Sequence, residues 1–215
     1  MFRPLLLGHR GARATRTIPE NTLASFDLVL AHGCDGFEFD VRRTADGRVV
    51  ICHDPEIHNI EIAKAGPGDL ADLPELDQIL ARYQTSAFLD IELKVAGLEH
   101  SVLQSLRARP PQCGYVVSCF LPEVLRALLD LDGSLPIGLL CETQPQLAAW
   151  RNLPAQYVLP HHTLTSVDLC EQLHSEKRKV VPWTVNTRKD MLRFQEMGVD
   201  GIISDHTEVL AGLRG

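Results

Sequence analysis

The sequence lacks paired cysteines, long apolar runs and clusters of basic residues, and each absence excludes a class of protein. Its six cysteines are scattered and form no C-x-x-C pair, so neither a zinc module nor a small disulfide framework is indicated. No stretch approaches the roughly 20 apolar residues of a membrane span, and the apolar run 5–7 is too short for a signal peptide. We therefore expect a cytoplasmic protein with reduced, buried thiols and no stable membrane anchor.

The charge balance is acidic rather than basic. The formal net charge is −7 at pH 7, and the densest basic run, 177–179, is only three residues long. Because binding of a phosphate backbone needs clustered Lys and Arg, nucleic acid is not expected as a partner. We interpret the short basic run as a solvated connection between a helix and a strand. The oligomeric state is left open.

Short β-type apolar runs alternate with helical patterns over almost all of the 215 residues. This alternation is typical of βαβ units around a parallel sheet. The absence of a Gly-rich dinucleotide loop favours a closed (β/α)8 TIM barrel over a doubly wound sheet, and no linker divides residues 1–215, which we interpret as one domain. Asn21 is a candidate N-cap for the first helix. The eight predicted strands are 4–8, 35–41, 87–93, 115–119, 136–140, 156–160, 179–183 and 200–204.

A ninth strand-like run, 48–52, follows the second predicted strand after Ala45-Asp46-Gly47. Asp-Gly is a strong signal for a tight hairpin. A two-residue turn at Asp46-Gly47 sets His53 directly across from Asp40, so we expect the hairpin to rise above the barrel and return His53 to the level of Asp40. The stretch 60–72 that follows has the composition of a loop.

Acidic residues project from the ends of two predicted strands. Glu38 and Asp40 are two residues apart and therefore share one face of their strand. Glu92 and Lys94 repeat this spacing at the end of the third strand. Carboxylates aimed together repel unless a cation lies between them, and oxygen donors suit a hard ion. We therefore predict one divalent cation, Mg²⁺ or Ca²⁺, held by Glu38, Asp40 and Glu92.

Barrel enzymes place their catalytic residues at the C-terminal ends of the strands. This rule brings His9 and Arg10 to the rim after the first strand, Ser118 after the fourth and Trp183 after the seventh. The hairpin brings His53 to the same rim. Two histidines beside a carboxylate cluster form a candidate acid–base pair, because His titrates near neutral pH. Two more histidines at this rim are weaker candidates for lining the pocket: His161 and His162.

Six motifs follow one another along the chain. They are H-R-G-A at 9–12, P-E-N-T at 19–22, E-x-D-V at 38–41 with T-x-D-G at 44–47 and H-D at 53–54, I-E-L-K at 91–94, W-T-V-N at 183–186, and G-V-D-G-I-I-S-D at 198–205. In type and order they resemble the glycerophosphodiester phosphodiesterase family. H-R-G-A alone would be a weak signal, whereas six motifs over nearly the whole chain are a specific one.

The resemblance implies a (β/α)8 barrel that hydrolyses glycerophosphodiesters, which are small-molecule substrates, to an alcohol and sn-glycerol 3-phosphate with a divalent cation, usually Ca²⁺ or Mg²⁺. By position, it implies that the metal ligands are Glu38, Asp40 and Glu92. It implies that His9 and His53 are the acid–base pair. It also implies that Arg10 and Lys94 hold the phosphate and that Trp183 forms an apolar wall beside the glycerol.

Two parts of the mechanism stay open. The nucleophile is either water or a glycerol hydroxyl of the substrate, which would give a cyclic phosphate first. Either histidine could be the acid, although the expected position of His53 beside Asp40, near the metal, favours His53. The chain also departs from the family pattern in the compact stretch after His53 and in His206, which follows Asp205 where the motif usually ends in Pro. These departures affect the segment that, by the resemblance, would cover the leaving alcohol as a lid.

Three other functions fit the sequence less well. A lysophospholipase-D-like enzyme acting on lipids would need an apolar groove or a membrane-facing surface, and no long amphipathic stretch indicates one. A barrel amidohydrolase would need His-x-His on the first strand, which here ends Gly8-His9-Arg10. A catalytically silent phosphodiester-binding barrel would be expected to have lost a metal ligand or a histidine, and the sequence retains all of them.

Overall fold

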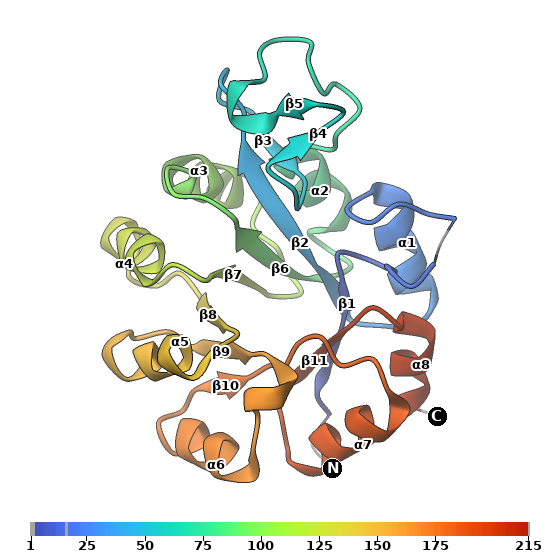
Figure 1. Ribbon diagram of the computed structural model, residues 1–215, viewed down its shortest axis with the longest axis vertical. Helices are drawn as coiled ribbons and strands as arrows, with labels where there is room; N and C mark the ends of the chain where they lie inside the picture. The colour runs from blue at the N-terminus through green and yellow to red at the C-terminus, as the bar shows by residue number, and fades with distance from the viewer. Residues whose placement is uncertain (1–2, 16, 215) are drawn as a thin grey trace.

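The computed structural model describes residues 3–15 and 17–214. In this part of the chain, eight parallel strands form a barrel with the helices outside it, which confirms the predicted (β/α)8 fold (Figure 1). The strands are short and almost entirely buried, as expected for a parallel sheet that helices cover. The barrel strands are β1 (Leu5–His9), β2 (Gly36–Arg43), β6 (Phe88–Leu93), β7 (Tyr115–Cys119), β8 (Ile137–Cys141), β9 (Tyr157–Pro160), β10 (Lys179–Val180) and β11 (Gly201–Ser204).

The helices bury one apolar stripe each against the barrel. In α4, for example, Val124, Leu125 and Leu128 are buried on one face, with Leu128 four and three residues after the other two. Among the described residues, no helix is long and apolar enough to cross a membrane. The α-helices are α1 (Leu23–Ala31), α2 (Leu76–Tyr83), α3 (Glu99–Ala108), α4 (Pro122–Leu131), α5 (Gln144–Ala148), α6 (Val167–Ser175), α7 (Arg188–Glu196) and α8 (Thr207–Ala211). Short 3₁₀ turns are η1 (Ile62–Lys64), η2 (Ala149–Asn152), η3 (His162–Leu164) and η4 (Gly212–Arg214).

The cap of α1 differs from the prediction. The N-cap is Thr22, whose hydroxyl accepts a hydrogen bond from the backbone N–H of Ser25. Asn21 instead has a left-handed backbone, with φ of 57°, and its side chain turns to the barrel. Asn tolerates this conformation better than most residues. The cap assignment to Asn21 was therefore wrong by one residue, and Asn21 is free for another role.

The barrel closes between its last two strands through loop-like hydrogen bonds rather than a regular ladder. The N–H of Asp200 donates to the carbonyl of Val180 at 2.8 Å, and the N–H of Ile203 donates to that of Pro182 at 3.1 Å. The strand predicted at 179–183 is shorter than expected, because Pro182 has no N–H to extend its ladder. Trp183 still reaches the rim, where it forms a single bridge with His161.

Two apolar layers hold the barrel. The larger one lies between helices and strands and contains a stacked pair, Phe26 of α1 and Phe37 of β2, with ring centroids 4.2 Å apart. The smaller layer fills the barrel interior and includes Leu7, Phe88 and Leu159. Because side chains alternate along a strand, the residues between the outward-facing ones on β2 point into the barrel. Glu38 and Asp40 therefore lie inside it, above the smaller layer.

The β2–β3 hairpin has a register one residue away from the predicted one. β3 (Val49–Ile51) pairs with β2 so that Ile51 faces Val41, and the N–H of Cys52 donates to the carbonyl of Asp40 at 3.0 Å. The connection has three residues, 45–47, and ends in Gly47 with φ of 91°. A three-residue loop with a left-handed Gly is a common alternative to the two-residue turn. The residue across from Asp40 is thus Cys52, and the predicted position of His53 was wrong.

The segment after β3 is more ordered than the predicted loop 60–72. It contains a small hairpin of β4 (Glu56–Ile57) and β5 (Ile60–Glu61), followed by η1. Its own apolar cluster includes Val50, Ile62 and Leu70, all buried. In Figure 1 this segment protrudes from the barrel beyond the end of β2. The compact stretch after His53 therefore forms a small folded unit at the rim.

Candidate active site

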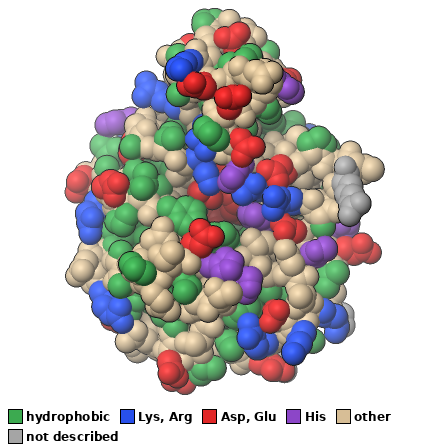
Figure 2. Space-filling view, viewed as in Figure 1, with side chains coloured by type: hydrophobic (Ala, Val, Ile, Leu, Met, Phe, Trp, Pro, Cys, Tyr) green, Lys and Arg blue, Asp and Glu red, His purple; other side chains and the backbone are tan. Residues whose placement is uncertain are grey.

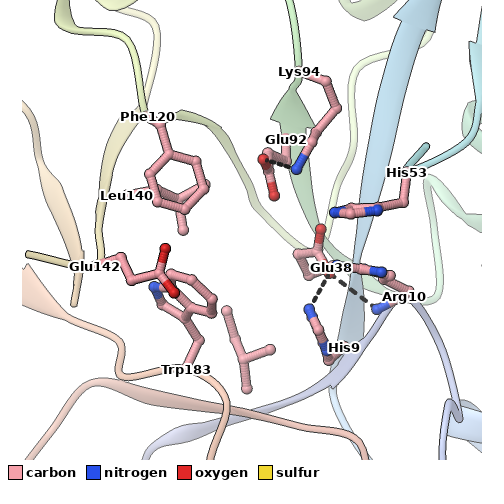
Figure 3. Close-up of a pocket in the computed structure, with 11 residues that line it drawn as sticks. His9, Arg10, Glu38, His53, Glu92, Lys94, Phe120, Leu140, Glu142 and Trp183 are labelled. Carbon is pink, nitrogen blue, oxygen red and sulfur yellow. Dashed lines mark hydrogen bonds and ion pairs between the residues drawn. The ribbon is translucent and has the colours of Figure 1, made fainter. Parts of the chain in front are cut away.

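A pocket of about 310 Å³ opens at the C-terminal ends of the barrel strands. All the predicted site residues except Asp40 line it, and Asp40 is buried beside Glu92. Figure 2 shows acidic, basic and histidine side chains gathered around this opening, and Figure 3 shows the lining residues converging on it. The lining residues are His9, Arg10, Glu38, His53, Glu92, Lys94, Phe120, Leu140, Glu142, Trp183 and Ile203.

Three buried carboxylates form the floor on one side. Glu38 and Asp40 come from β2, and the parallel register sets Asp40 beside Glu92 of β6. One oxygen of each lies within 4.8 Å of the others. Burial, together with the neighbouring Asp40 charge, raises the pKa of Glu38 well above its usual value and that of Glu92 to about 7. Three carboxylates in this arrangement resist being ionised together.

Two cations partly offset this charge. The Lys94 ammonium, just past the end of β6, lies 2.6 Å from Glu92 Oε1 and 3.4 Å from Asp40 Oδ1. Arg10 Nε lies 3.3 Å from Asp40 Oδ2. Burial opposes ionisation of Asp40, but Lys94, Arg10 and a hydrogen bond from Asn21 outweigh it and lower the Asp40 pKa. Asp40 is therefore the carboxylate that stays ionised.

The carboxylate cluster has spare coordinating capacity. Glu38 Oε1 and Asp40 Oδ1 are buried and accept no hydrogen bond, although the Lys94 ammonium is near the latter. Buried polar atoms without a partner are rare in folded proteins and call for a ligand. Oxygen donors alone, with no Cys or His among them, fit a hard divalent cation. The donor set is therefore compatible with Mg²⁺ or Ca²⁺.

The two histidines are oriented in the same way. His9 Nδ1 lies 2.8 Å from Asp205 Oδ1, and His53 Nδ1 lies 2.8 Å from Asp54 Oδ1. A carboxylate acceptor at Nδ1 keeps the proton there and leaves Nε2 for the pocket. Asn186 donates to Asp205 at 2.7 Å, and despite burial the hydrogen bonds from His9 and Asn186 lower the Asp205 pKa to about 2. Each imidazole thus presents Nε2 to the pocket.

His53 reaches the pocket even though its register differs from the prediction. The guanidinium of Arg42, at the end of β2, donates from Nε and Nη2 to the carbonyl oxygen of His53 at 2.8 and 2.5 Å. This clamp turns the chain back over β2 just after β3 ends. The His53 side chain is 32% exposed, whereas that of His9 is 11% exposed. His53 therefore lies at the outer edge of the pocket and His9 deeper.

The opposite wall of the pocket is apolar. Trp183 donates its indole N–H to the carbonyl of Leu159 at 2.8 Å, which fixes the ring, and Phe120 meets it edge-on with centroids 5.6 Å apart. Leu140, which lies beside Phe120 in Figure 3, and Ile203 also line the pocket. Glu142 is a polar lining residue beside Trp183 that the sequence analysis did not single out. The pocket thus has a charged side and an apolar side.

Comparison with known proteins identifies the family. The model of the glycerophosphoryl diester phosphodiesterase family matches residues 9–88 and 90–209, which is most of the chain. The chain belongs to this family. It is 29% identical over 241 residues to a glycerophosphodiester phosphodiesterase of Caldanaerobacter subterraneus subsp. tengcongensis, with 99% of this chain and 98% of the relative covered.

Solved structures agree on the fold. A glycerophosphodiester phosphodiesterase from Thermotoga maritima superposes with a TM-score of 0.84 at 22% identity, covering 100% of both chains. A phosphodiesterase from Oleispira antarctica, in complex with the product sn-glycerol-3-phosphate, gives a TM-score of 0.86 at 22% identity, covering 99% of this chain and 97% of that one. Together with the family match, the relatives identify this barrel as an enzyme, a glycerophosphodiester phosphodiesterase.

Several polar residues that support the site of this phosphodiesterase were missed as functional residues. Glu20 pairs with Arg10 at 3.0 Å, and Asn21 donates to Asp40 at 2.8 Å. Both belong to the P-E-N-T motif, so the family resemblance carried the signal. Asp205 belongs to the last motif in the same way. Glu142 lies outside every motif, and only the fold brings it to the pocket.

Three weaker candidates lie outside the pocket lining. Ser118 is buried below it and donates to Asp90 at 2.6 Å, while burial raises the Asp90 pKa to about 7. His161 and His162 lie at the rim behind Trp183, with the His161 ring 5.5 Å from the indole. Neither histidine lines the pocket. The less favoured possibility, that these two line the pocket, is therefore not met.

Proposed function

We propose that this phosphodiesterase hydrolyses glycerophosphodiesters to an alcohol and sn-glycerol 3-phosphate, using one divalent cation and proton transfer by His9 and His53. The observation that carries the proposal is the composition of a single pocket, in which a three-carboxylate cluster faces two carboxylate-oriented histidines and two cations. The product bound in the Oleispira antarctica relative supports the choice of substrate. Residues 1–215 are taken as one catalytic domain.

Glu38, Asp40 and Glu92 would hold the cation, Mg²⁺ or Ca²⁺. When bound, the cation would neutralise the carboxylates and polarise a non-bridging phosphoryl oxygen. The raised pKa values of Glu38 and Glu92 are what a cation-free cluster of this geometry should have. The proposal therefore explains why these three acids are buried within one site.

Arg10 and Lys94 bind the phosphate oxygens in this proposal. Attack on a phosphodiester increases negative charge on the non-bridging oxygens, so fixed cations stabilise the transition state more than the ground state. Glu20 holds the Arg10 guanidinium from the outside at 3.0 Å. Arg10 also donates its backbone N–H to Glu38 at 2.9 Å, which ties the phosphate-binding residue to the proposed metal ligand.

His9 and His53 transfer protons at Nε2. One removes a proton from the nucleophile, water or a substrate hydroxyl, and the other protonates the leaving alkoxide. We assign the acid role to His53, because it lies at the outer edge of the pocket, where the alcohol leaves. Burial lowers the His53 pKa in the free enzyme, and the negative charge of a bound diester acts in the opposite direction.

The apolar wall receives the glycerol carbons. Trp183, with its ring fixed by the bond to Leu159, forms the surface on which they pack. A lysophospholipase-D-like activity on the same site is the alternative. It would need a membrane-facing surface in addition to the pocket, and the sequence has no long amphipathic stretch.

Release of glycerol 3-phosphate from purified protein tests the proposal. We expect turnover of water-soluble glycerophosphodiesters such as glycerophosphocholine, with a higher kcat/KM than for micellar lysophosphatidylcholine. Both reactions are measured with the metal-loaded enzyme, and a dead Asp40→Asn protein serves as the control for contaminating activity. A clear preference for the lipid would favour the alternative, and no release from any diester would refute the proposed reaction.

A further inference from the structure

Arg13 follows the H-R-G-A motif, in the loop between β1 and α1, and has no role in the proposed mechanism so far. Its side chain is 42% exposed and does not line the catalytic pocket. Its backbone is nevertheless held on both sides. The N–H of Ala12 donates to Ser25 Oγ at 2.8 Å, and the N–H of Ala14 donates to the carbonyl oxygen of Asp205 at 3.1 Å. The loop therefore fixes the point from which the Arg13 guanidinium extends.

The Arg13 guanidinium lies between two carboxylates. Its Nε donates to Glu20 Oε2 at 2.5 Å, and its Nη1 lies 3.5 Å from Asp205 Oδ1. Each carboxylate also holds one residue of the active site. Glu20 Oε1 accepts a hydrogen bond from Arg10 Nη1 at 3.0 Å, and Asp205 Oδ1 lies 2.8 Å from His9 Nδ1. The five side chains therefore form a ring that closes through the peptide bond between His9 and Arg10.

Arg13 makes the only side-chain connection between these two carboxylates in the part of the chain that the structure describes. The second oxygen of Asp205, Oδ2, accepts from Asn186 at 2.7 Å, which holds that carboxylate from the far side. The Glu20 side chain is 33% exposed, and its partners among the described residues are Arg10 and Arg13. Without Arg13, Glu20 would be held by Arg10 alone.

The backbone at Arg10 is where such support is needed. Arg10 and Gly11 both have left-handed backbones, with φ of 52° and 89°. Because this conformation is unfavourable for a residue other than glycine, surrounding contacts have to hold it. An arginine suits the task, since its donors form a fixed planar fork that can hold two carboxylates in a set orientation, whereas a lysine is a point charge on a flexible stem.

We propose that Arg13 is a positioning residue for the hydrolysis, acting by bridging Glu20 and Asp205. The bridge keeps the Arg10 guanidinium and the His9 imidazole aimed at the same phosphate. This inference rests on the proposed function and adds a residue to it. Arg13 itself touches neither the substrate nor the cation, so its effect depends on the two carboxylates.

The first test is Arg13→Ala, assayed on glycerophosphocholine and on a nitrophenyl phosphodiester. We expect kcat/KM to fall roughly threefold to tenfold on both substrates, because His9 and Arg10 serve both reactions and the ion pairs are partly exposed. The melting temperature should fall by no more than about 2–4 °C. Guanidinium ions added at millimolar concentration should restore most of the lost activity, whereas sodium chloride at the same ionic strength should not.

Dependence on the two carboxylates is the second test. In a protein that already carries Glu20→Gln and Asp205→Asn, the Arg13→Ala substitution should change kcat/KM by less than about twofold, because no charged pair is left to bridge. Arg126→Ala provides the matched control. Arg126 is exposed on α4, which lies across the barrel from α1 in Figure 1, and its removal should leave both substrates unchanged.

Wild-type kcat/KM in the Arg13→Ala protein would overturn the inference. An equal loss with and without the two carboxylates would also overturn it, since Arg13 would then act elsewhere. A loss that guanidinium ions do not restore, together with a much lower melting temperature, would mean that Arg13 supports only the fold. A wild type that hydrolyses no diester would instead reject the proposed function, and this inference with it.

Discussion

The barrel interior has two halves that share one backbone design but carry opposite chemistry. Inward positions on β1, β2 and β6 hold His9, Glu38 and Glu92, with Asp40 and Asp90 beside them. Inward positions on the other side of the barrel include a second set, which is apolar. That set is Leu140, Leu159, Val181 and Ile203.

The two halves therefore contribute differently to stability and to chemistry. The apolar half fills the barrel and fixes the indole of Trp183, so it stabilises the fold and shapes the glycerol end of the pocket. The charged half buries acids whose pKa values are raised, so ionising them opposes folding until a cation neutralises them. Removing a side chain should therefore have opposite consequences on the two sides.

Removal of the cation should have the largest effect, and only through the charged half. We expect excess EDTA to abolish glycerol 3-phosphate release and added Mg²⁺ or Ca²⁺ to restore it, because the proposed ligands are all hard oxygens. Circular dichroism of the chelated protein should still indicate a folded barrel. Full turnover in excess EDTA would mean that the reaction needs no cation at the carboxylate cluster.

Removal of either histidine should have the next largest effect. General acid–base assistance contributes about 10²–10⁴ in rate. His53→Ala should lose that much on a natural glycerophosphodiester but much less on a nitrophenyl phosphodiester, whose leaving group needs no proton, whereas His9→Ala should lose activity on both. The reverse pattern would exchange the two roles. Near-normal rates for both variants on both substrates would exclude proton transfer by these histidines.

A truncation in the apolar half should act on stability instead of chemistry. Leu159→Ala removes a buried side chain from the interior layer and should lower the free energy of unfolding by about 2–4 kcal/mol, with kcat nearly unchanged. Urea denaturation followed by assays at 20 °C would measure both quantities. If kcat instead falls tenfold while the variant is fully folded, stability and catalysis cannot be assigned to different halves of the barrel.

Glu92→Gln should have the smallest effect and the opposite sign. The folded pKa of Glu92, about 7, lies above its ordinary value of 4.5, so the folded state holds the proton longer than the unfolded state. Without metal, wild-type stability should therefore fall as the pH rises from about 4.5 to 7. The variant should match the wild type at pH 4.5 and exceed it by about 1–3 kcal/mol at pH 8 in EDTA.

In the same variant, metal affinity should fall although the stability of the metal-free protein rises. Glu92→Gln should weaken Mg²⁺ or Ca²⁺ affinity, measured by calorimetry, while the barrel stays folded. If the melting temperature of the metal-free variant drops sharply and its metal affinity is unchanged, Glu92 stabilises the fold and is not a ligand.

Sequence periodicity was enough to predict the barrel and, except for β10, the bounds of its strands to within two residues, because burial on both faces and alternation with helices leave few alternatives. The same periodicity predicted that Glu38, Asp40 and Glu92 lie close together, since these residues lie at strand ends where the register is regular. The hairpin was harder. Ala45-Asp46-Gly47 fits both a two-residue and a three-residue connection, and local sequence does not say which one the flanking strands accept.

Residues that act through the loops were not predictable from periodicity. Thr22 and Asn21 are both good N-cap residues, and only the contact with Asp40 distinguishes their roles. Glu142 reaches the pocket because β8 ends beside Trp183, a fact of three-dimensional packing. His53 reaches it through Arg42, whose clamp on a backbone carbonyl leaves no trace in the sequence pattern.

The protruding segment between β3 and α2 has its own apolar cluster and meets the catalytic residues at its first two positions, His53 and Asp54. Its internal contacts mean that a swap of residues 55–72 for another compact hairpin would leave the proposed metal ligands, the cations beside them, the apolar wall and the His53–Asp54 pair in place. Loops carried on a rigid scaffold change more readily than the scaffold itself. The surface beside the pocket can therefore change in this enzyme without altering the residues proposed for its chemistry.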